Sequence, residues 1–534
     1  MNSLIMGWRS RLNWQRFRQR VVAIALIIGL AVWLLPQSPA MARTGSEENL
    51  SIQPYLDRVE EEISEFTLNN GIHFIVLERS QAPVISFMIY FDVGAAEEED
   101  GKTGAAHYLE HLAFKGTSLI GTKDYDAERP LLNEMDAVFE ELLAAQAAGD
   151  EDAIARLQEA FEAIRAEAAE YVEQNEFGRI VEEAGGVGLN ATTSADATRY
   201  FYSLPSNKIE LWMSLESERF LDPVFREFYE EKEVILEERQ MRTDNSPIGR
   251  MVEAFLETTF PDYVYGRPII GYAEDLQKMT RDDIREFYET HYTPGHMHVA
   301  IVGDVDLPEV QQMAEAYFGR YPARPDAPDV VAEPLPQTEP REVTLYLNSE
   351  PWYLEGFHRP GINHPDNAVY SVIDGILTSG RTARLYQSLV EGGQVALDVG
   401  AANGFPGDRF ENVMLFYALT APGHTVDEIQ TMMDAEFERL RTEPVSAEEL
   451  DRIKTQALAG LVRSLDSNRG MASLLAEYQA KTGDWRNLFA EIAAINQVTA
   501  EDVMRVAQST FRPGNLTIGR ILPEDDAPME TSRP

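Results

Sequence analysis

The feature that most constrains the fold is a group of prolines that interrupts the chain beyond its midpoint. Six prolines lie between residues 322 and 340, namely Pro322, Pro325, Pro328, Pro334, Pro336 and Pro340. Such a segment is extended and poor in regular structure. A chain of 534 residues also exceeds the size of one ordinary domain. The sequence therefore predicts domains at 50–321 and 342–524, a linker at 322–341 and a short tail at 525–534.

Both predicted domains repeat one order of elements. Strand-like runs rich in β-branched and aromatic residues open them, at 74–77, 84–91 and 343–347. A helix that starts at a capping-box pattern closes each, at Thr280 with Asp283 and at Thr499 with Asp502. A strand follows each helix, at 299–304 and 515–519. The patterns predict an α+β class: two homologous domains, each a mostly antiparallel sheet with helices packed on one face.

One segment of the first domain departs from this repeat. Residues 128–175 are rich in Ala and Glu, and their apolar residues recur at spacings of three and four, which is typical of helices. Gly149 and Asp150 indicate a turn in the middle. We expect a helical hairpin inserted into the first domain, with a structural role.

The first 42 residues have the pattern of an export signal. Five arginines between residues 9 and 20 precede an apolar run at 21–35, which is short for a membrane span. Ala40-Met41-Ala42 then offers a small-x-small cleavage site. The pattern predicts a signal peptide at 1–42 and a periplasmic protein. The alternative is an uncleaved anchor that holds the protein at the membrane, facing outside the cytoplasm.

Charge and cysteine content exclude several functions. The formal net charge of -43 argues against nucleic acid as a partner, because phosphates would be repelled. The chain has no cysteine, which excludes thiolate nucleophiles and Cys-bound zinc or iron–sulfur clusters. Any metal must therefore be held by His, Asp or Glu.

The strongest local signal is the pattern His107-Tyr108-Leu109-Glu110-His111. On a helix, residues i and i+4 share a face, so both imidazoles can reach one metal ion. Glu110 is adjacent to that face and can act on a water molecule without being a ligand. The alternative is a pair of surface histidines on a helix.

A metal held by two histidines needs a third protein ligand, which is commonly a carboxylate in catalytic zinc sites. Residues 229–239 predict a helix with many acidic positions. Spacing alone does not choose among these glutamates, and each of them could equally belong to a solvated helix face.

The run from His107 through Phe114-Lys115-Gly116-Thr117 resembles the pitrilysin/insulinase family of zinc metallopeptidases, closest to its mitochondrial processing peptidase-like bacterial branch. Further agreement comes from residues 188–194, 231–238, 292–294 and 301–304. The resemblance implies one Zn²⁺ per chain, held by His107, His111 and Glu238.

The same resemblance implies a zinc endopeptidase that hydrolyses peptides or unfolded polypeptide segments. Glu110 is then the general base that takes a proton from a zinc-activated water and passes it to the leaving amine. Glu231 matches a second catalytic glutamate. Asn190 and Ala191 match an edge strand that binds substrate peptide by backbone pairing.

The second domain departs from the family pattern. It lacks the zinc motif, and Val390 and Leu397 occupy the places of an Arg and a Tyr that grip substrate in family members. Neither side chain can donate a hydrogen bond to an oxyanion. Either a homologous zinc-less subunit supplies the pair in a heterodimer, or Arg381, Arg384 or Tyr386 replaces it within this chain or a homodimer. A non-catalytic scaffold or subunit of a peptidase-like complex is the alternative function.

Overall fold

The computed structural model describes residues 53–325, 327, 330 and 333–527, so the predicted signal peptide at 1–42 lies outside them. By its internal contacts the chain divides into Met1–Pro54 and Tyr55–Pro534, and the second unit contains both sheets of the protein. Within the described part, none of the helices combines the length and apolar composition that a membrane crossing requires. The described residues between 322 and 340 form neither helix nor strand. We refer to residues 55–321 as the first half and to 341–527 as the second half.

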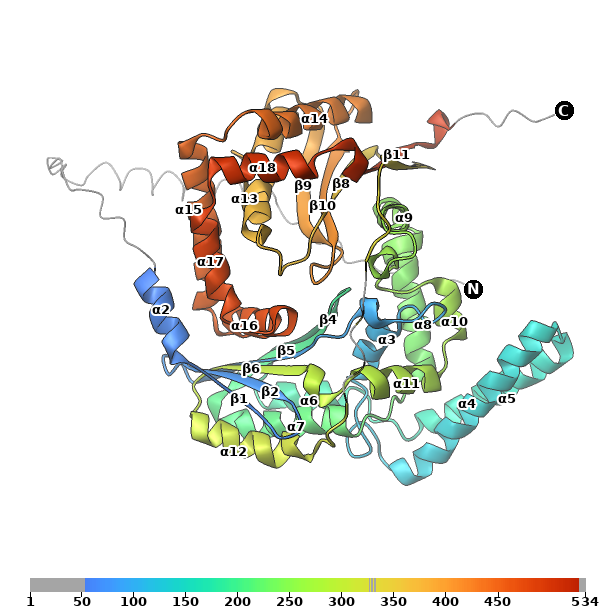
Figure 1. Ribbon diagram of the computed structural model, residues 1–534. Helices are drawn as coiled ribbons and strands as arrows, with labels where there is room; N and C mark the ends of the chain where they lie inside the picture. Colours follow the sequence, from blue (N-terminus) through green and yellow to red (C-terminus); the bar gives the residue numbers. More distant parts are fainter. Residues whose placement is uncertain (1–52, 326, 328–329, 331–332, 528–534) are drawn as a thin grey trace, which may run out of the picture. The chain divides into compact units, whose positions relative to one another are not determined.

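The first half is built around a six-stranded sheet of order β1-β2-β6-β3-β5-β4 (Figure 1). Its strands are β1 (Ile63–Thr67), β2 (His73–Glu78), β3 (Val84–Phe91), β4 (Val187–Thr193), β5 (Thr198–Pro205) and β6 (Met297–Gly303). All neighbouring strands are antiparallel except β2 and β6. β4 pairs with β5 on one side only and forms an edge of the sheet.

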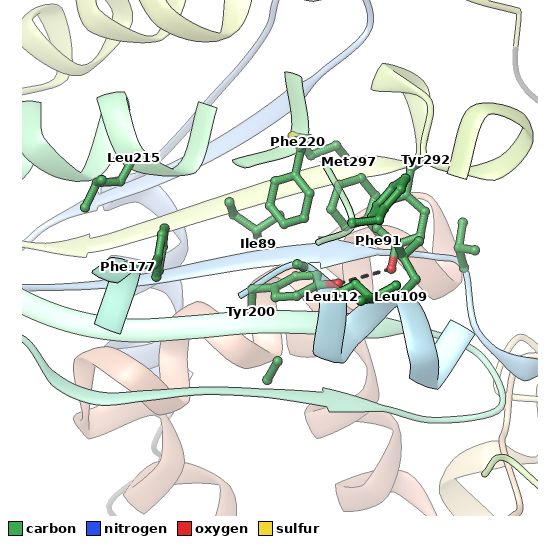
Figure 2. Close-up of a cluster of buried hydrophobic side chains, with 14 of the residues drawn as sticks. Ile89, Phe91, Leu109, Leu112, Phe177, Tyr200, Leu215, Phe220, Tyr292 and Met297 are labelled. Carbon is green, nitrogen blue, oxygen red and sulfur yellow. Dashed lines mark hydrogen bonds between the residues drawn. The ribbon is translucent and has the colours of Figure 1, made fainter. Parts of the chain in front are cut away.

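One face of this sheet carries the main core of the first half. The helices that supply core side chains include α3 (Ala105–Leu112), α6 (Glu176–Glu183), α7 (Ile209–Leu221), α8 (Phe228–Arg239), α11 (Arg281–His291) and α12 (Leu307–Tyr317). Figure 2 shows the part of the core beneath α3, where Leu109 and Leu112 lie close to Phe91, Tyr200 and Tyr292. Burial of each such side chain contributes about 1.5–3 kcal/mol, so the apolar side of α3 is firmly anchored.

The second half contains a five-stranded sheet of order β7-β11-β8-β10-β9. Its strands are β7 (Arg341–Leu347), β8 (Trp352–Arg359), β9 (Ala396–Phe405), β10 (Asn412–Thr420) and β11 (Leu516–Pro523). Here too a single pair, β7 with β11, is parallel. Helices α13 (Asn367–Thr378), α14 (Val426–Thr442), α15 (Ala447–Asp466), α17 (Asn487–Gln497) and α18 (Ala500–Thr510) pack against it and against each other. The expected class, two α+β units with mostly antiparallel sheets, is confirmed.

Several local expectations hold at the level of single elements. Both capping boxes are present, at the starts of α11 and α18. The helical insertion consists of α4 (Tyr125–Ala148) and α5 (Glu151–Ala169), joined at Gly149, whose φ of 67° suits a glycine. The hairpin therefore begins three residues before the expected position and ends six residues earlier.

The second face of each sheet is also covered, which the sequence did not lead us to expect. Helix α16 (Asn468–Thr482) of the second half packs on β3 and β6 of the first sheet. Helix α9 (Pro247–Thr259) of the first half packs on β7 and β11 of the second sheet. The two halves thus exchange a helix, because each one supplies the cover for the other's sheet.

Candidate metal centre

Helix α3 carries the histidine motif, and its start is held by a buried carboxylate. The two oxygens of Glu98 accept hydrogen bonds from the backbone N–H groups of Gly104, at 2.8 Å, and Ala106, at 2.9 Å. These N–H groups have no partner inside the helix, so the two oxygens of Glu98 satisfy them. Burial raises the pKa of Glu98 to about 8.

Three predicted ligands come together above α3. The Nε2 atoms of His107 and His111 lie 3.8 Å and 3.6 Å from Oε2 of Glu238, on helix α8. One potential donor atom from each residue lies within 4.8 Å of the others. Ligand atoms about 2.1 Å from a tetrahedral zinc ion are about 3.4 Å apart, so this spacing is too long for hydrogen bonds and fits a shared ion.

The electrostatics of the two imidazoles also fit a metal. Burial, together with the neighbouring His111, lowers the pKa of His107 to about 3, so its ring stays neutral and keeps a free lone pair. The Nδ1 atom of His107 is buried and has no hydrogen-bond partner among the described residues. Neutral imidazoles with a carboxylate are a donor set that zinc accepts readily.

Glu231 lies behind the donor set and contacts His111. Its Oε2 is 3.0 Å from Nδ1 of His111, and its Oε1 is 2.5 Å from Nζ of Lys115. Burial alone would raise the pKa of Glu231, but the hydrogen bonds from His111 and Lys115 hold it below the usual value. A carboxylate here makes Nδ1 the protonated nitrogen of His111 and leaves Nε2 free for a metal.

Glu238 is oriented in a similar way by a neighbour on the next turn. Nη1 of Arg242 lies 2.6 Å from Oε1 of Glu238, so Oε2 is the oxygen that faces the imidazoles. Arg242 belongs to the π-helical turn Gln240–Asp244 that continues α8.

Glu110 points into the same region without joining the three donors. Oγ1 of Thr193, at the end of β4, donates a hydrogen bond of 2.5 Å to Oε2 of Glu110. Burial raises the pKa of Glu110, and the bond from Thr193 opposes that effect. The second oxygen remains available to a substrate or a water molecule.

These groups line a cavity of about 1240 Å³. His107, Glu110, His111 and Glu238 share it with β4 residues Asn190 and Ala191, the two predicted substrate-binding residues. The remaining wall is partly apolar and comes from α8 and the turn that follows it, from α9, from residues 268–270 and from the second half. Its apolar members are Val234, Met241, Ile248, Val252, Leu256, Pro268, Ile269, Ile270, Phe405 and Pro406.

The residues considered as replacements for the missing Arg and Tyr lie elsewhere. Arg384 makes a two-fold ion pair with Glu449, at 2.9 Å and 2.7 Å, and Arg381 pairs with Glu391 at 2.9 Å. Among the described residues that line the cavity there is no Arg381, Arg384 or Tyr386, and no Val390 or Leu397. From the part of the second half that the structure describes, the segment Phe405-Pro406 lines the cavity.

Sequence reasoning missed three residues that support the site: Lys115, Thr193 and Arg242. The spacing of Glu238 and Arg242, four residues apart on a helix, is a signal that could have indicated their contact. Lys115 and Thr193 offered no such signal, because each reaches a partner far away in the sequence.

Comparisons with known proteins bear on the family and the fold of the chain. Residues 74–136 and 163–272 match the family described as insulinase (peptidase family M16), and 278–457 match the peptidase M16 inactive domain. The unmatched residues between 136 and 163 fall within the α4–α5 hairpin. The zinc protease PqqE of Helicobacter pylori is 27% identical over 475 residues, which cover 87% of this chain and 93% of that protein.

Solved structures give the same result. A protease from Helicobacter pylori has a TM-score of 0.73 at 25% identity, covering 86% of this chain and 99% of that one. The first half of the periplasmic protease PqqL from Escherichia coli shares the fold, with a TM-score of 0.64 at 18% identity over 86% of this chain and 92% of that one. The resemblance seen in the sequence is confirmed, and the chain belongs to the insulinase (M16) family of peptidases.

Proposed function

We propose that this protein is a zinc-dependent endopeptidase that cleaves peptides or unfolded polypeptide segments, with one zinc site per chain. The observation that carries the proposal is the convergence of His107, His111 and Glu238 on one point, with Glu110 beside them in a large cavity. A non-catalytic scaffold would have no use for three metal donors and an adjacent Glu110. Their presence together therefore favours an enzyme over a scaffold.

Each residue has a distinct role in this proposal. His107, His111 and Glu238 bind the ion, while Glu231 and Arg242 orient His111 and Glu238. Zinc at such a site polarises a carbonyl oxygen and lowers the pKa of a water molecule. Glu110 takes the proton of the attacking water on its free oxygen, while Thr193 holds the other oxygen, and it then delivers that proton to the leaving amine.

The edge strand β4 binds the substrate in an extended form. Its unpaired side offers backbone N–H and C=O groups next to Glu110, and Asn190 and Ala191 lie at the cavity. Backbone pairing gives affinity without strict sequence selection, which suits a peptidase that acts on unfolded segments.

We also propose a partner subunit and an exported location. Val390 and Leu397 cannot donate hydrogen bonds, and no arginine from the second half lines the described cavity. A zinc-less homologous subunit that supplies these donors, or a second copy of this chain, would complete the site. Export to the periplasm rests on the pattern of residues 1–42 alone.

The test is peptide hydrolysis by the purified protein before and after metal removal. We expect a strong chelator to abolish cleavage of an unfolded polypeptide and stoichiometric zinc to restore it. Glu110→Gln should bind one zinc per chain by elemental analysis but lose turnover by a factor of about 10² to 10⁴. Glu134→Gln, an exposed change on α4, is the matched control and should cleave normally.

The outcomes separate the parts of the proposal. Cleavage by Glu110→Gln at the rate of the unaltered protein would show that Glu110 is not the general base. Zinc binding without cleavage, rescued by adding a zinc-less homologue, would identify the active form as a heterodimer.

A further inference from the structure

A second cavity lies on the opposite face of β4 and β5, between these strands and the start of α16. Its volume is about 440 Å³. The residues that line it are Met88, Thr192, Arg199, Phe201, Ser467, Arg469, Gly470 and Ser473. Thr192 lines both this cavity and the one that contains Glu110, so the two cavities meet at the edge strand.

Strand geometry assigns the two cavities to alternate side chains of a bound peptide. In β4, Thr193 turns toward Glu110, whereas Thr192 is paired with Arg199 and turns toward α16. Successive side chains of a strand point to opposite faces, and directly opposed residues of paired strands share a face. A peptide strand added to β4 would therefore direct every second side chain toward the second cavity.

The charge of the second cavity is opposite to that of the protein as a whole. Its charged residues are two arginines, in a chain whose net charge is -43. Arg199 is already engaged, since its Nη2 lies 3.5 Å from Oε1 of Glu477 and its guanidinium lies over the ring of Tyr90.

Arg469 is the cation that remains available. Its guanidinium stacks on Phe201, with 4.2 Å between the Cζ atom and the ring centroid. Among the described residues no carboxylate lies within ion-pairing distance of it. Arg469 is exposed, and its Nη1 is 3.3 Å from the position that a Cβ atom on Gly188 would take, so the guanidinium lies next to the start of β4.

We infer that this cavity is a second substrate subsite, in which Arg469 receives a carboxylate of the bound peptide. The inference rests on the proposed peptidase function and narrows its substrates to peptides with an Asp or Glu side chain at a defined place along the strand. A planar guanidinium that is already fixed by stacking loses little freedom when it binds a carboxylate in a two-pronged manner. The free C-terminal carboxylate of a peptide is the other possible source of the same chemistry.

The experiment uses acetylated and amidated peptides that differ only by Glu or Gln at one position, moved along the sequence. We expect the Glu peptide to have a KM lower by about threefold to tenfold at one position, or at two positions that are two residues apart. High salt should reduce this difference in KM between the Glu and Gln peptides. A Gln peptide with a free C-terminus has a terminal carboxylate but no Glu side chain. A lower KM for this peptide would identify the terminal carboxylate as the group that Arg469 binds.

The same peptides, labelled with fluorescein, are also titrated by anisotropy into the zinc-loaded Glu110→Gln protein, so that binding is measured without cleavage. In the Arg469→Gln protein, the Glu and Gln peptides should have nearly equal KM values in the cleavage assay and nearly equal Kd values in the titration. Arg463→Gln, an exposed change on α15 outside the cavity, is the control. This variant should prefer the Glu peptide as strongly as the unaltered protein does.

Two results would overturn the inference. One is equal KM and Kd for Glu and Gln peptides at every position, and the other is a Glu preference that survives Arg469→Gln. Either result, obtained with normal cleavage, leaves the proposed function standing. If the unaltered zinc protein cleaves no peptide, either alone or with a zinc-less homologue added, the proposed function fails, and the anisotropy titration still decides the subsite.

Discussion

The candidate metal centre has an inner layer, the three donors His107, His111 and Glu238, and an outer layer of residues that contact these donors. The outer residues determine which atoms of the donors face one another. Glu231 contacts Nδ1 of His111, and Arg242 contacts Oε1 of Glu238, so Nε2 and Oε2 face each other. Lys115 extends the outer layer by one residue, since its Nζ lies 2.5 Å from Glu231. Such outer partners strengthen metal binding without touching the metal.

Replacement of Lys115 tests that outer layer. Lys115→Met removes the cation that holds Glu231, so we expect zinc affinity to fall by about tenfold or more, as measured by competition with a chromogenic chelator. Lys115→Arg keeps the charge and should retain most of the affinity. Lys278→Met, an exposed lysine paired with Glu274 on α10 (Ala273–Lys278), serves as the control. Equal affinities for all of these variants would contradict the role.

Single residues of the site differ in how far the sequence reveals them. His107 and His111 are visible because both lie on one helical turn, where spacing translates directly into geometry. Glu238 needed the family resemblance, since several glutamates occupy the same helix. Thr193 and Lys115 were out of reach, because their contacts join residues that are 83 and 116 positions apart. Local periodicity carries no information on such pairs.

At the scale of elements, α3 depends on its N-terminal contact more than on helix propensity. It spans eight residues and has no capping side chain of its own, because Gly104 precedes it with a φ of 90°. Helices this short are marginal without tertiary support. Glu98 and the buried Leu109 and Leu112 supply that support.

Removal of the Glu98 carboxylate should therefore weaken both the helix and the metal site. We expect Glu98→Ala to lower the free energy of unfolding by about 1.5–3 kcal/mol, since two buried backbone N–H groups lose their hydrogen-bond partner. Zinc affinity should fall in parallel. Thermal unfolding with and without zinc measures both effects. Glu99→Ala, an exposed neighbour, should change neither, and equal effects of the two substitutions would contradict the argument.

The hairpin α4–α5 illustrates what periodicity can and cannot predict. Its two helices and its turn follow from the apolar spacing and from Gly149. Its contact with α8 does not, because Arg165 reaches Glu230 at 2.6 Å and Glu233 at 2.9 Å through side chains that look like solvated surface in the sequence. The hairpin thus packs on the helix that carries Glu231 and Glu238.

At the scale of the whole molecule, the two halves are tied by charge as well as by the exchanged helices. Asp196 of the first half accepts hydrogen bonds from the backbone of Asp408 and Arg409, at 2.8 Å and 3.1 Å. Lys481 of α16 pairs with Asp408 and with Glu477, the latter at 2.9 Å. Asp196 is buried and the other members of this cluster are half-buried. Asp408 lies two residues beyond Phe405-Pro406, the segment that lines the cavity of the candidate metal centre.

Loss of the Lys481 charge should loosen that connection. Glu477 keeps Arg199 as a partner, but Lys481→Met leaves Asp196 and Asp408 without the cation that pairs with them, so we expect the free energy of unfolding to fall by about 3–5 kcal/mol. Denaturant unfolding measures the loss, and limited proteolysis should cut the 322–340 segment faster. Lys454→Met, which removes an exposed bond to the carbonyl of Asn496, should cost less than about 1 kcal/mol. If Lys481→Met also lowers the free energy of unfolding by less than about 1 kcal/mol, the cluster contributes little to stability.

The sequence predicted two similar units but not the exchange of α9 and α16 between them. An amphipathic pattern says that a helix has an apolar side, not which sheet that side will meet. Met251 and Phe255 of α9 are fully buried against strands of the second half, and nothing in their own neighbourhood indicates that destination.

The position of α16 late in the chain affects the order in which the protein can mature. The ribosome completes the strands of the first sheet at residue 303, so one side of that sheet stays bare while residues 304–467 are still being made. Side chains such as Met88 and Val302, now buried, would meanwhile face water or a chaperone. The half that carries the candidate metal centre therefore reaches its finished form only after the opposite end of the chain has been made.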